Sequence, residues 1–150
     1  MNNPVIYPAQ WLMPAPETNL TAWAGVACDQ YTSEPEYWSE VEKTVGEAVS
    51  TLKITLPEIY LEEEGVAEKI EKINSAMLDY INRGIFAEYK QSYIYLERTL
   101  ADGTVRQGIV GMVDLEEYDF SKGSKSMVRA TEGTVVSRIP PRLKVRCDAP

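Results

Sequence analysis

The sequence EEEGVAEKIEKINSAMLDYIN, residues 62–82, decides one half of the fold, because its apolar residues repeat at helical spacing. That stripe consists of Val66, Ile70, Ile73, Met77, Leu78 and Ile81. Three glutamates at the start favour the positive end of the helix dipole, and Gly84 is a typical end signal. We therefore predict a long amphipathic helix whose stripe packs in the core.

The sequence YIYLERTLADGTV, residues 93–105, decides the other half. It begins with aromatic and β-branched residues, which favour strands, and Asp102-Gly103 is a strong turn dipeptide. Apolar character resumes from Val105 to Leu115, with Gly108 and Gly111 inside it. These features predict a β-hairpin, with the glycines at a bulge or a close backbone approach.

A second helix is expected from Ser33 to Gly46. Ser33 has the position of a cap, Pro35 suits the first turn, and Gly46 is a plausible stop. A short helix is expected over residues 127–139, ended by Pro140-Pro141.

Three further strands are predicted from apolar runs or alternation, over residues 22–28, 52–56 and 143–147. Residues 1–20 are rich in proline and indicate an extended arm. The expected class is α+β: a mixed, mostly antiparallel sheet with two main helices packed on it and an N-terminal extended arm. We expect residues 1–150 to form a single domain, and the end at Pro150 suggests the N-terminal fragment of a longer protein.

Composition excludes several classes of site. The chain has no histidine, so Ser-His-Asp and Cys-His catalysis and the usual zinc sites are excluded within it. Cys28 and Cys147 are far apart, without a CxxC motif, and are expected to be reduced, buried thiols; a long-range disulfide is the alternative. With no secretory signal and no apolar run long enough to span a membrane, a cytoplasmic protein without a membrane partner is expected.

The charge is unevenly distributed. Residues 1–120 hold 8 basic and 21 acidic side chains, a net charge of −13, whereas residues 121–150 hold 7 basic and 2 acidic ones, a net charge of +5. The acidic total argues against a nucleic-acid partner. The basic end favours a small anionic or phosphorylated ligand, or an acidic surface of a partner; charge pairing between the two parts is the simpler interpretation.

The first candidate site is the segment 121–134, a Ser/Gly/Lys loop expected to lead into a helix. Such loops hold phosphate through backbone N–H groups and the helix dipole, although a Walker A motif is absent. The expected ligand-binding residues are Ser124, Lys125, Arg129, Thr131, Thr134 and Arg138. Glu132 is the candidate catalytic residue, as general base or Mg²⁺ ligand. The alternative is a mobile surface loop followed by an ordinary capped helix.

The second candidate is the segment 28–33, where Asp29 follows an expected strand end and could meet a metal or a ribose hydroxyl. The alternative is that these residues only turn the chain and cap a helix. Tyr93 and Tyr95 are a third candidate, for stacking bases, but packing in a sheet is the simpler interpretation.

Two long strings, with DLEEYD, residues 114–119, between them, carry a family resemblance: WAGVACDQYTSEPEYW, residues 23–38, and VRATEGT, residues 128–134, which is followed by SRIPPR, residues 137–142. Both resemble signatures of an uncharacterised bacterial and archaeal family, domain of unknown function 1015. The resemblance covers nearly all of the chain and implies a protein of several hundred residues, so that a C-terminal part of the same protein would be a partner. Many members have His-Glu where this chain has Thr131-Glu132, and Asp-Arg where it has Ser137-Arg138, which puts any histidine-dependent mechanism in doubt here.

A weaker similarity is to serine kinases of the ParB/sulfiredoxin-like class, which combine a phosphate-binding, arginine-containing helix start with a carboxylate base. Two functions are therefore expected to compete. One is a phosphate- or nucleotide-handling small-molecule enzyme, for example a phosphotransferase acting on serine, with Mg²⁺ and a nucleotide or pyrophosphate as cofactors. The other is a non-catalytic ligand-sensing or interaction domain that uses the N-terminal arm.

Overall fold

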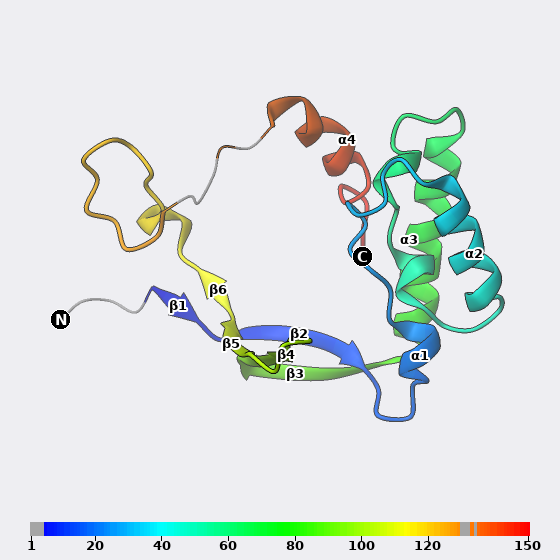
Figure 1. Ribbon diagram of the computed structural model, residues 1–150, viewed down its shortest axis with the longest axis horizontal. Helices are drawn as coiled ribbons and strands as arrows, with labels where there is room; N and C mark the ends of the chain where they lie inside the picture. Colours follow the sequence, from blue (N-terminus) through cyan, green and yellow to red (C-terminus); the bar gives the residue numbers. More distant parts are fainter. Residues whose placement is uncertain (1–4, 130–132, 134) are drawn as a thin grey trace. The chain divides into compact units, whose positions relative to one another are not determined.

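The computed structural model describes residues 5–129, 133 and 135–150, and its fold is α+β (Figure 1). The chain forms two compact units. The strand unit contains the described residues of Met1–Met13 and Glu88–Thr134, and the helical unit contains Pro14–Ala87 and Val135–Pro150. The predicted α+β class is thereby confirmed, while the single domain stays a prediction.

The helical unit is built from α-helices joined by short 3-10 helices. Its elements are α1 (Leu20–Trp23), α2 (Pro35–Val45), η1 (Thr51–Ile54), η2 (Glu58–Tyr60), α3 (Val66–Asn82), η4 (Val136–Arg138) and α4 (Ile139–Lys144). The two long helices, α2 and α3, are the two that the sequence predicts.

The ends of α2 and α3 follow the turn residues. Gly46 ends α2 with φ of 50°, and Gly84 follows α3 with φ of 67°, in the left-handed region that glycine tolerates best. The expected cap at Ser33 is wrong: Glu34 occupies the cap position and makes no side-chain hydrogen bond there. Helix α3 begins at Val66, one turn later than expected, because Gly65 has φ of 84° and interrupts the helix.

An aromatic cluster forms the core of the helical unit. The ring of Trp23 lies 6.1 Å from that of Tyr80 on α3 and 5.7 Å from that of Phe86, the first residue of strand β3 (Phe86–Ser92). The Tyr80 hydroxyl accepts a hydrogen bond from the Ser50 backbone N–H at 3.0 Å, and Ser50 is 1% exposed. The cluster fixes α1, α3 and the start of β3 against one another.

The three strands predicted by periodicity in this unit are wrong. Residues 20–23 form α1 and residues 24–27 are exposed, non-regular backbone. Residues 51–54 form η1, because the Ser50 hydroxyl accepts from the Leu52 N–H and so begins a helical turn. Residues 143–147 complete α4 and the turn after it, since the two prolines lie in the first turn of this helix, where their fixed φ is favourable, and do not end one.

The strand unit contains hydrogen-bonded pairs of strands. Its further elements are β1 (Ile6–Tyr7), β2 (Ala9–Pro14), β4 (Ile94–Thr99), β5 (Val105–Val110), β6 (Met112–Val113) and the 3-10 helix η3 (Leu115–Glu117). They form two-stranded sheets: β1 with β6, β2 with β3, and β4 with β5. The β4–β5 hairpin is antiparallel, as predicted, from Ile94↔Val110 to Thr99↔Val105.

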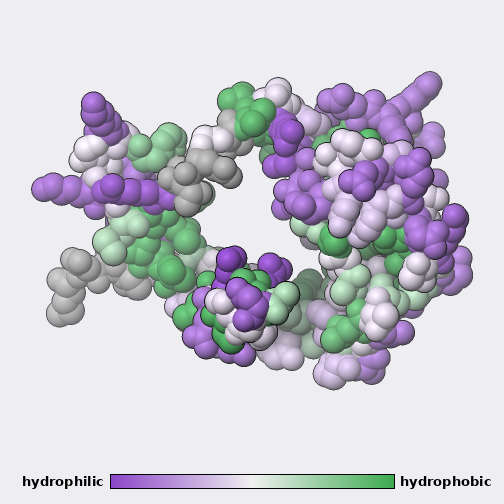
Figure 2. All heavy atoms as spheres, in the orientation of Figure 1, coloured by the Kyte–Doolittle hydropathy of each residue, from purple (hydrophilic) through white to green (hydrophobic). Residues whose placement is uncertain are grey.

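The N-terminal arm is extended, as predicted, and pairs as β1 and β2. Strand β1 is antiparallel to β6, and a single parallel bridge joins Tyr118 and Val128. Figure 2 shows hydrophobic side chains on the visible face around β1 and β6, where Ile6 and Met112 are half-exposed.

The two glycines of the hairpin region differ. A Cβ atom at Gly111 would lie 2.8 Å from the Tyr7 carbonyl oxygen and 2.8 Å from Ile6 Cγ2, so the predicted close backbone approach is confirmed there. At Gly108 a Cβ atom would meet nothing within 4 Å. Only Gly111 is therefore required for β1 to reach β6.

Candidate functional site

The helical unit contains a cleft of about 700 Å³, here called the α4 cleft. Its charged lining residues are Asp29, Glu58, Arg142 and Arg146. Its apolar lining residues are Ile54, Leu56, Leu61, Met77, Ile139, Leu143, Val145 and Ala149. Cys28 and Thr55 complete the wall. A cleft of this size, apolar with a few polar groups, has the usual character of a small-molecule site.

The segment that carries Asp29 is held at both ends. The Trp23 carbonyl accepts hydrogen bonds from the hydroxyl groups of Thr51, at 2.8 Å, and Ser50, at 3.4 Å. At the other end the Glu58 N–H donates to the Cys28 carbonyl at 2.8 Å. These bonds hold residues 24–28 next to η1 and η2, and Asp29, in the turn that follows, lines the cleft. Cys28 and Asp29 of the second candidate segment thus line a cleft, although no strand precedes them, and the role of Asp29 stays a prediction.

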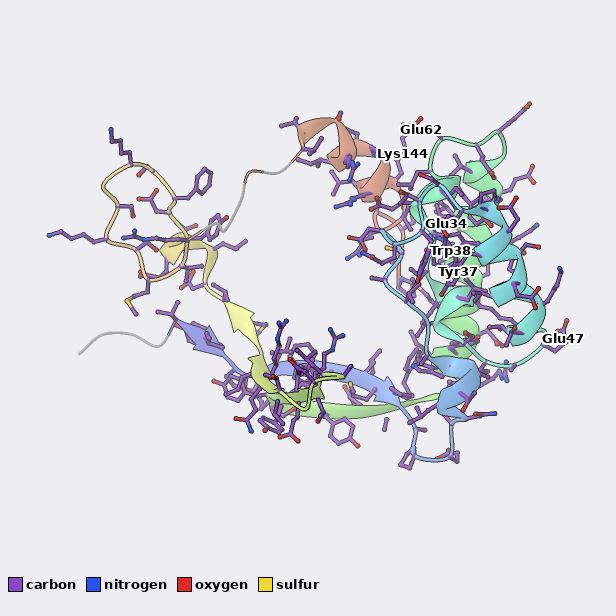
Figure 3. The ribbon with its side chains drawn as sticks, viewed as in Figure 1. Glu34, Tyr37, Trp38, Glu47, Glu62 and Lys144 are labelled. Carbon is purple, nitrogen blue, oxygen red and sulfur yellow. The ribbon has the colours of Figure 1, made fainter. Side chains whose placement is uncertain are left out.

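The loop after Asp29 is also constrained. Tyr31 has φ of 50°, which is uncommon for a residue other than glycine. The Trp38 indole N–H donates to the Tyr31 carbonyl at 3.1 Å, and the Tyr31 ring stacks on Tyr37 at 3.9 Å. Tyr37 and Trp38 are adjacent on α2 (Figure 3). The aromatic residues of the 23–38 string thus hold an unfavourable backbone conformation next to the cleft.

The charged groups of the cleft differ in their partners. Arg142 forms an ion pair with Glu58, whose side chain is only 11% exposed. Arg146 forms no ion pair within the part of the chain that the structure describes. An arginine with a free planar fork is suited to phosphate or carboxylate oxygens. Arg146 is therefore the cleft's best candidate for binding an anion, with Arg142 held beside it by Glu58.

The pKa of the Cys28 thiol depends on burial and on the charged side chains that line the cleft. Burial raises the pKa of Cys28 above its ordinary value of 9.0, and the nearby carboxylates of Glu58 and Asp29 raise it further. Arg146 acts in the opposite direction. Cys28 therefore stays a neutral thiol near pH 7. Both cysteines are free, but Cys147 is exposed, so the expectation that both are buried is wrong.

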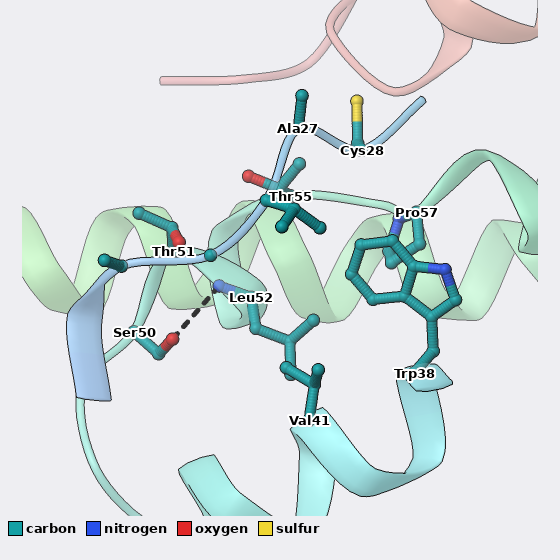
Figure 4. A pocket seen from close by; sticks show the side chains of 12 residues that line it. Ala27, Cys28, Trp38, Val41, Ser50, Thr51, Leu52, Thr55 and Pro57 are labelled. Atoms are coloured by element: carbon teal, nitrogen blue, oxygen red, sulfur yellow. Dashed lines mark hydrogen bonds between the residues drawn. The ribbon is translucent and has the colours of Figure 1, made fainter. Parts of the chain in front are cut away.

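A second, smaller cavity of about 380 Å³ is lined by residues 24–28 (Figure 4). The Trp38 ring and Val41 of α2 line it together with Leu52 and Pro57. The Leu52 N–H donates to the Ser50 hydroxyl at 3.3 Å, so this backbone group in the cavity wall already has a hydrogen-bond partner. With Thr51 and Thr55 as its further polar side chains, this cavity offers no charged group to a ligand.

The first candidate segment belongs to the strand unit, and its polar side chains form hydrogen bonds to the backbone of the same loop. Arg129 donates to the carbonyl oxygens of Ser124 and, at 3.1 Å, Ser126. The Ser126 hydroxyl donates to the Glu117 carbonyl and accepts from the Val128 N–H at 3.1 Å. Two nitrogen atoms of the Arg129 guanidinium group, which was expected to bind phosphate, thus donate to carbonyl groups of its own loop.

Asp119 also ties this loop. Its carboxylate accepts from the Ser121 N–H at 2.9 Å, and this bond, with those to the Ser121 and Ser124 hydroxyls and the nearby Arg129 charge, lowers the Asp119 pKa. The prediction of a helix over residues 127–139 is wrong. Residues 127–129 are not helical, and among the described residues after them the first helical turn is η4. The helix dipole therefore does not act on Ser124 and Lys125.

The expected site residues are thus divided. Ser124, Lys125 and Arg129 lie in the strand unit, whereas Asp29 and Arg138 lie in the helical unit. Arg138 is exposed and precedes the first residue of α4, one helical turn before Arg142. The remaining expected residues, Thr131, Glu132 and Thr134, lie outside the described residues.

Sequence reasoning missed Glu58 and Arg146 as site residues. Arg146 was assigned to a strand that does not form, yet Arg138, Arg142 and Arg146 recur every four residues, the spacing of one helix face. That spacing was the available signal. Glu58 gave none, because its role depends on η2 meeting α4 residues more than 80 positions away.

Over residues 5–129, 133 and 135–150 there is no cluster of three or more Cys, Asp or Glu side chains able to hold a metal ion. In the same residues no helix combines the length and the apolar character needed to cross a membrane.

Comparison with protein families identifies the relationship. The model of the family described as "Protein of unknown function (DUF1015)" matches residues 6–150. The chain belongs to the DUF1015 family. The resemblance carried by residues 23–38 and 128–142 is thereby confirmed. Comparisons with curated proteins and with solved structures gave no match. In this DUF1015 chain, Asp29 and Arg146 share the lining of the α4 cleft.

Proposed function

We propose that this chain is part of a small-molecule enzyme that handles phosphate, and that its anionic ligand binds in the α4 cleft. The observation that carries the proposal is Arg146: it lines a cleft of about 700 Å³ and forms no ion pair within the described residues. Arg142 lies in the same lining, held by Glu58.

The chemistry of the cleft fits phosphoryl transfer better than nucleophilic catalysis. Phosphoryl transfer depends on positioning and on neutralising charge, which arginines supply. Asp29 offers a carboxylate to a hydroxyl group of ribose or of an amino acid such as serine. A nucleotide or pyrophosphate with Mg²⁺ is the cofactor that this reaction would need.

The residues of the first candidate segment keep a place in the proposal. Glu132 remains the proposed base, and Lys125 and Arg138 remain proposed ligand-binding residues; Lys125 is exposed in the loop of the strand unit, and Arg138 is exposed just before α4 in the helical unit. Arg129 is the weaker member, because its guanidinium already binds two carbonyl groups of its own loop. We therefore rank Arg146 above Arg129 as the residue that binds the anion.

Thermal unfolding against a ligand panel tests this proposal. The panel contains ATP, ADP, pyrophosphate and phosphate, each with Mg²⁺, with and without serine. A ligand present at about 100 times its dissociation constant stabilises the protein by ~2.7 kcal/mol. For a domain of this size the midpoint should rise by roughly 5 °C. The rise should disappear in Arg146→Gln and persist in Lys144→Gln, which removes a positive charge from α4 outside the cleft lining (Figure 3).

The variant Arg129→Ala separates the two candidate segments. If it abolishes the shift while Arg146→Gln retains it, the anion binds at the loop and the α4 cleft is not the site. If no member of the panel stabilises the wild-type chain, phosphate handling by this chain is wrong.

A non-catalytic interaction domain is the second candidate. It is favoured by the exposed apolar side chains of the strand unit, among which Ile109, Leu115, Phe120 and Met127 are each at least 67% exposed. Large exposed apolar groups commonly mark interaction surfaces. This alternative predicts no response to the ligand panel, and loss of partner binding without loss of folding in Ile109→Ser.

A further inference from the structure

We infer that the ligand of the α4 cleft is amphipathic: a phosphate or carboxylate group joined to an alkyl or aryl body. The inference rests on the proposed function for the position of the anion at Arg146, and it adds the class of molecule that carries the anion.

The apolar part of the lining comes from three separate parts of the helical unit. Leu56 follows η1, Met77 lies on α3, and Leu143 and Val145 belong to α4 and the turn after it. Leu143 is 55% exposed although it lines the cleft. Apolar surface that faces water is stabilised when a ligand covers it, so this lining favours a ligand with an apolar body.

The charged part of the lining consists of two acidic and two basic side chains. Glu58, Asp29 and Arg146 line the same cleft, and Arg142 is paired with Glu58. Since Glu58 neutralises Arg142, the groups left to a ligand are Arg146 and Asp29. Arg146 suits one anionic group, and Asp29 suits a hydrogen-bond donor beside it.

The size of the cleft supports the same conclusion. Cavities of roughly 300–1,000 Å³ hold drug-sized ligands, whereas an inorganic phosphate fills only a small part of such a volume. A free phosphate would leave the contacts to Leu56, Met77 and Leu143 unused. An anion with an apolar body would use both parts of the lining.

Isothermal titration calorimetry with n-hexyl phosphate, inorganic phosphate and hexanoate tests the inference on the whole chain. Each buried methylene group contributes about fourfold in affinity, so three buried methylenes make hexyl phosphate on the order of fiftyfold tighter than phosphate. Arg146→Gln should weaken hexyl phosphate at least tenfold, and the matched variant Lys144→Gln should leave it unchanged.

A second pair of variants tests the apolar part. Leu143→Ser should weaken hexyl phosphate several-fold and leave inorganic phosphate unaffected. Val136→Ser, at a position that is 74% exposed and outside the cleft lining, is the control and should change neither.

The outcomes separate this inference from the proposed function. Equal affinity for phosphate and hexyl phosphate, lost in Arg146→Gln, overturns the amphipathic ligand and keeps phosphate handling. Tight binding of hexanoate without binding of either phosphate compound supports the amphipathic ligand and overturns phosphate handling. Hexyl phosphate binding that survives Arg146→Gln, or binding of none of the three compounds, overturns the inference.

Discussion

The helical unit and the strand unit use their apolar residues in opposite ways. In the helical unit Trp23, Trp38, Leu56, Ile73 and Tyr80 are each no more than 9% exposed. In the strand unit Tyr95, Ile109 and Met112 are at least 52% exposed, and Ala9 is its one buried apolar residue among those described. Side-chain packing therefore defines the helical unit, whereas backbone pairing defines the strand unit.

This difference has a consequence for where a rigid site can form. Two-stranded sheets are marginally stable on their own, because they cannot bury a face. A binding site needs side chains held by packing on several sides. The α4 cleft combines Met77 of α3, a helix that the aromatic core holds, with α4, which the ion pair of Arg142 and Glu58 ties to η2. The loop around Arg129 is fixed by its own hydrogen bonds. We therefore expect substitutions in the two units to differ sharply.

The largest expected effect is at the aromatic core. Trp23→Ala should lower the free energy of unfolding by about 3–5 kcal/mol, because a buried aromatic ring is replaced by a cavity. Ile109→Ala in the hairpin should change it by less than ~1 kcal/mol, since Ile109 is 67% exposed. Urea unfolding followed by circular dichroism measures both. Where Trp23→Ala does not fold, Trp23→Phe serves instead, and equal losses in the two units would contradict the comparison.

A smaller effect is expected from single hydroxyl groups. Tyr80→Phe removes the acceptor of the buried Ser50 N–H and should cost about 1–3 kcal/mol. The matched variant Tyr95→Phe removes a hydroxyl that donates to Glu97 at the surface, at 2.7 Å, and should leave the unfolding midpoint unchanged. The same urea titration applies. A loss in Tyr95→Phe as large as that in Tyr80→Phe would show that the hairpin is packed in solution.

Backbone spacing should matter in the strand unit where side-chain packing does not. Gly111→Ala places a methyl group against the Tyr7 carbonyl and should cost about 1 kcal/mol, the lower end for overpacking, because only the short β1–β6 pair is affected. Hydrogen exchange of the β6 amides should accelerate. Gly108→Ala, where space is open, is the control and should leave these amides protected.

The smallest change is a pH effect at the cleft. Since burial, Glu58 and Asp29 raise the pKa of Cys28, its alkylation by iodoacetamide should reach half its maximal rate above pH 9.0 in a Cys147→Ser background. Glu58→Gln should move this midpoint down and Arg146→Gln should move it up. The stability that protonated Cys28 contributes is present below its ordinary pKa and is lost as pH rises through the folded-state pKa. A midpoint insensitive to Glu58→Gln would mean that Glu58 lies elsewhere in solution.

Much of the local structure could be predicted because it depends on neighbours in sequence. The apolar stripe of residues 66–81 fixes helix α3, and the Asp102-Gly103 turn fixes the register of β4 and β5. Gly46 and Gly84 end their helices where the periodicity stops. The predicted strands over residues 52–56 and 143–147 failed, because short alternating runs also suit one helical turn with one face covered.

For the candidate site, Asp29 could be singled out from the sequence, because polar residues follow an apolar run there. The cleft around it could not. The ion pair of Glu58 and Arg142, and the stacking of Tyr31 on Tyr37, depend on how separate segments meet.

The sequence by itself determined the α+β class, the long helix, the hairpin and the uneven charge, since periodicity, turn chemistry and composition are local properties. Only the tertiary structure decided that Arg146 shares a cleft with Asp29 while Arg129 is used by its own loop. The partner of each arginine depends on which segments meet in the folded chain. Local sequence patterns therefore do not predict which arginine binds a carbonyl group, which pairs with a carboxylate and which lines a cavity.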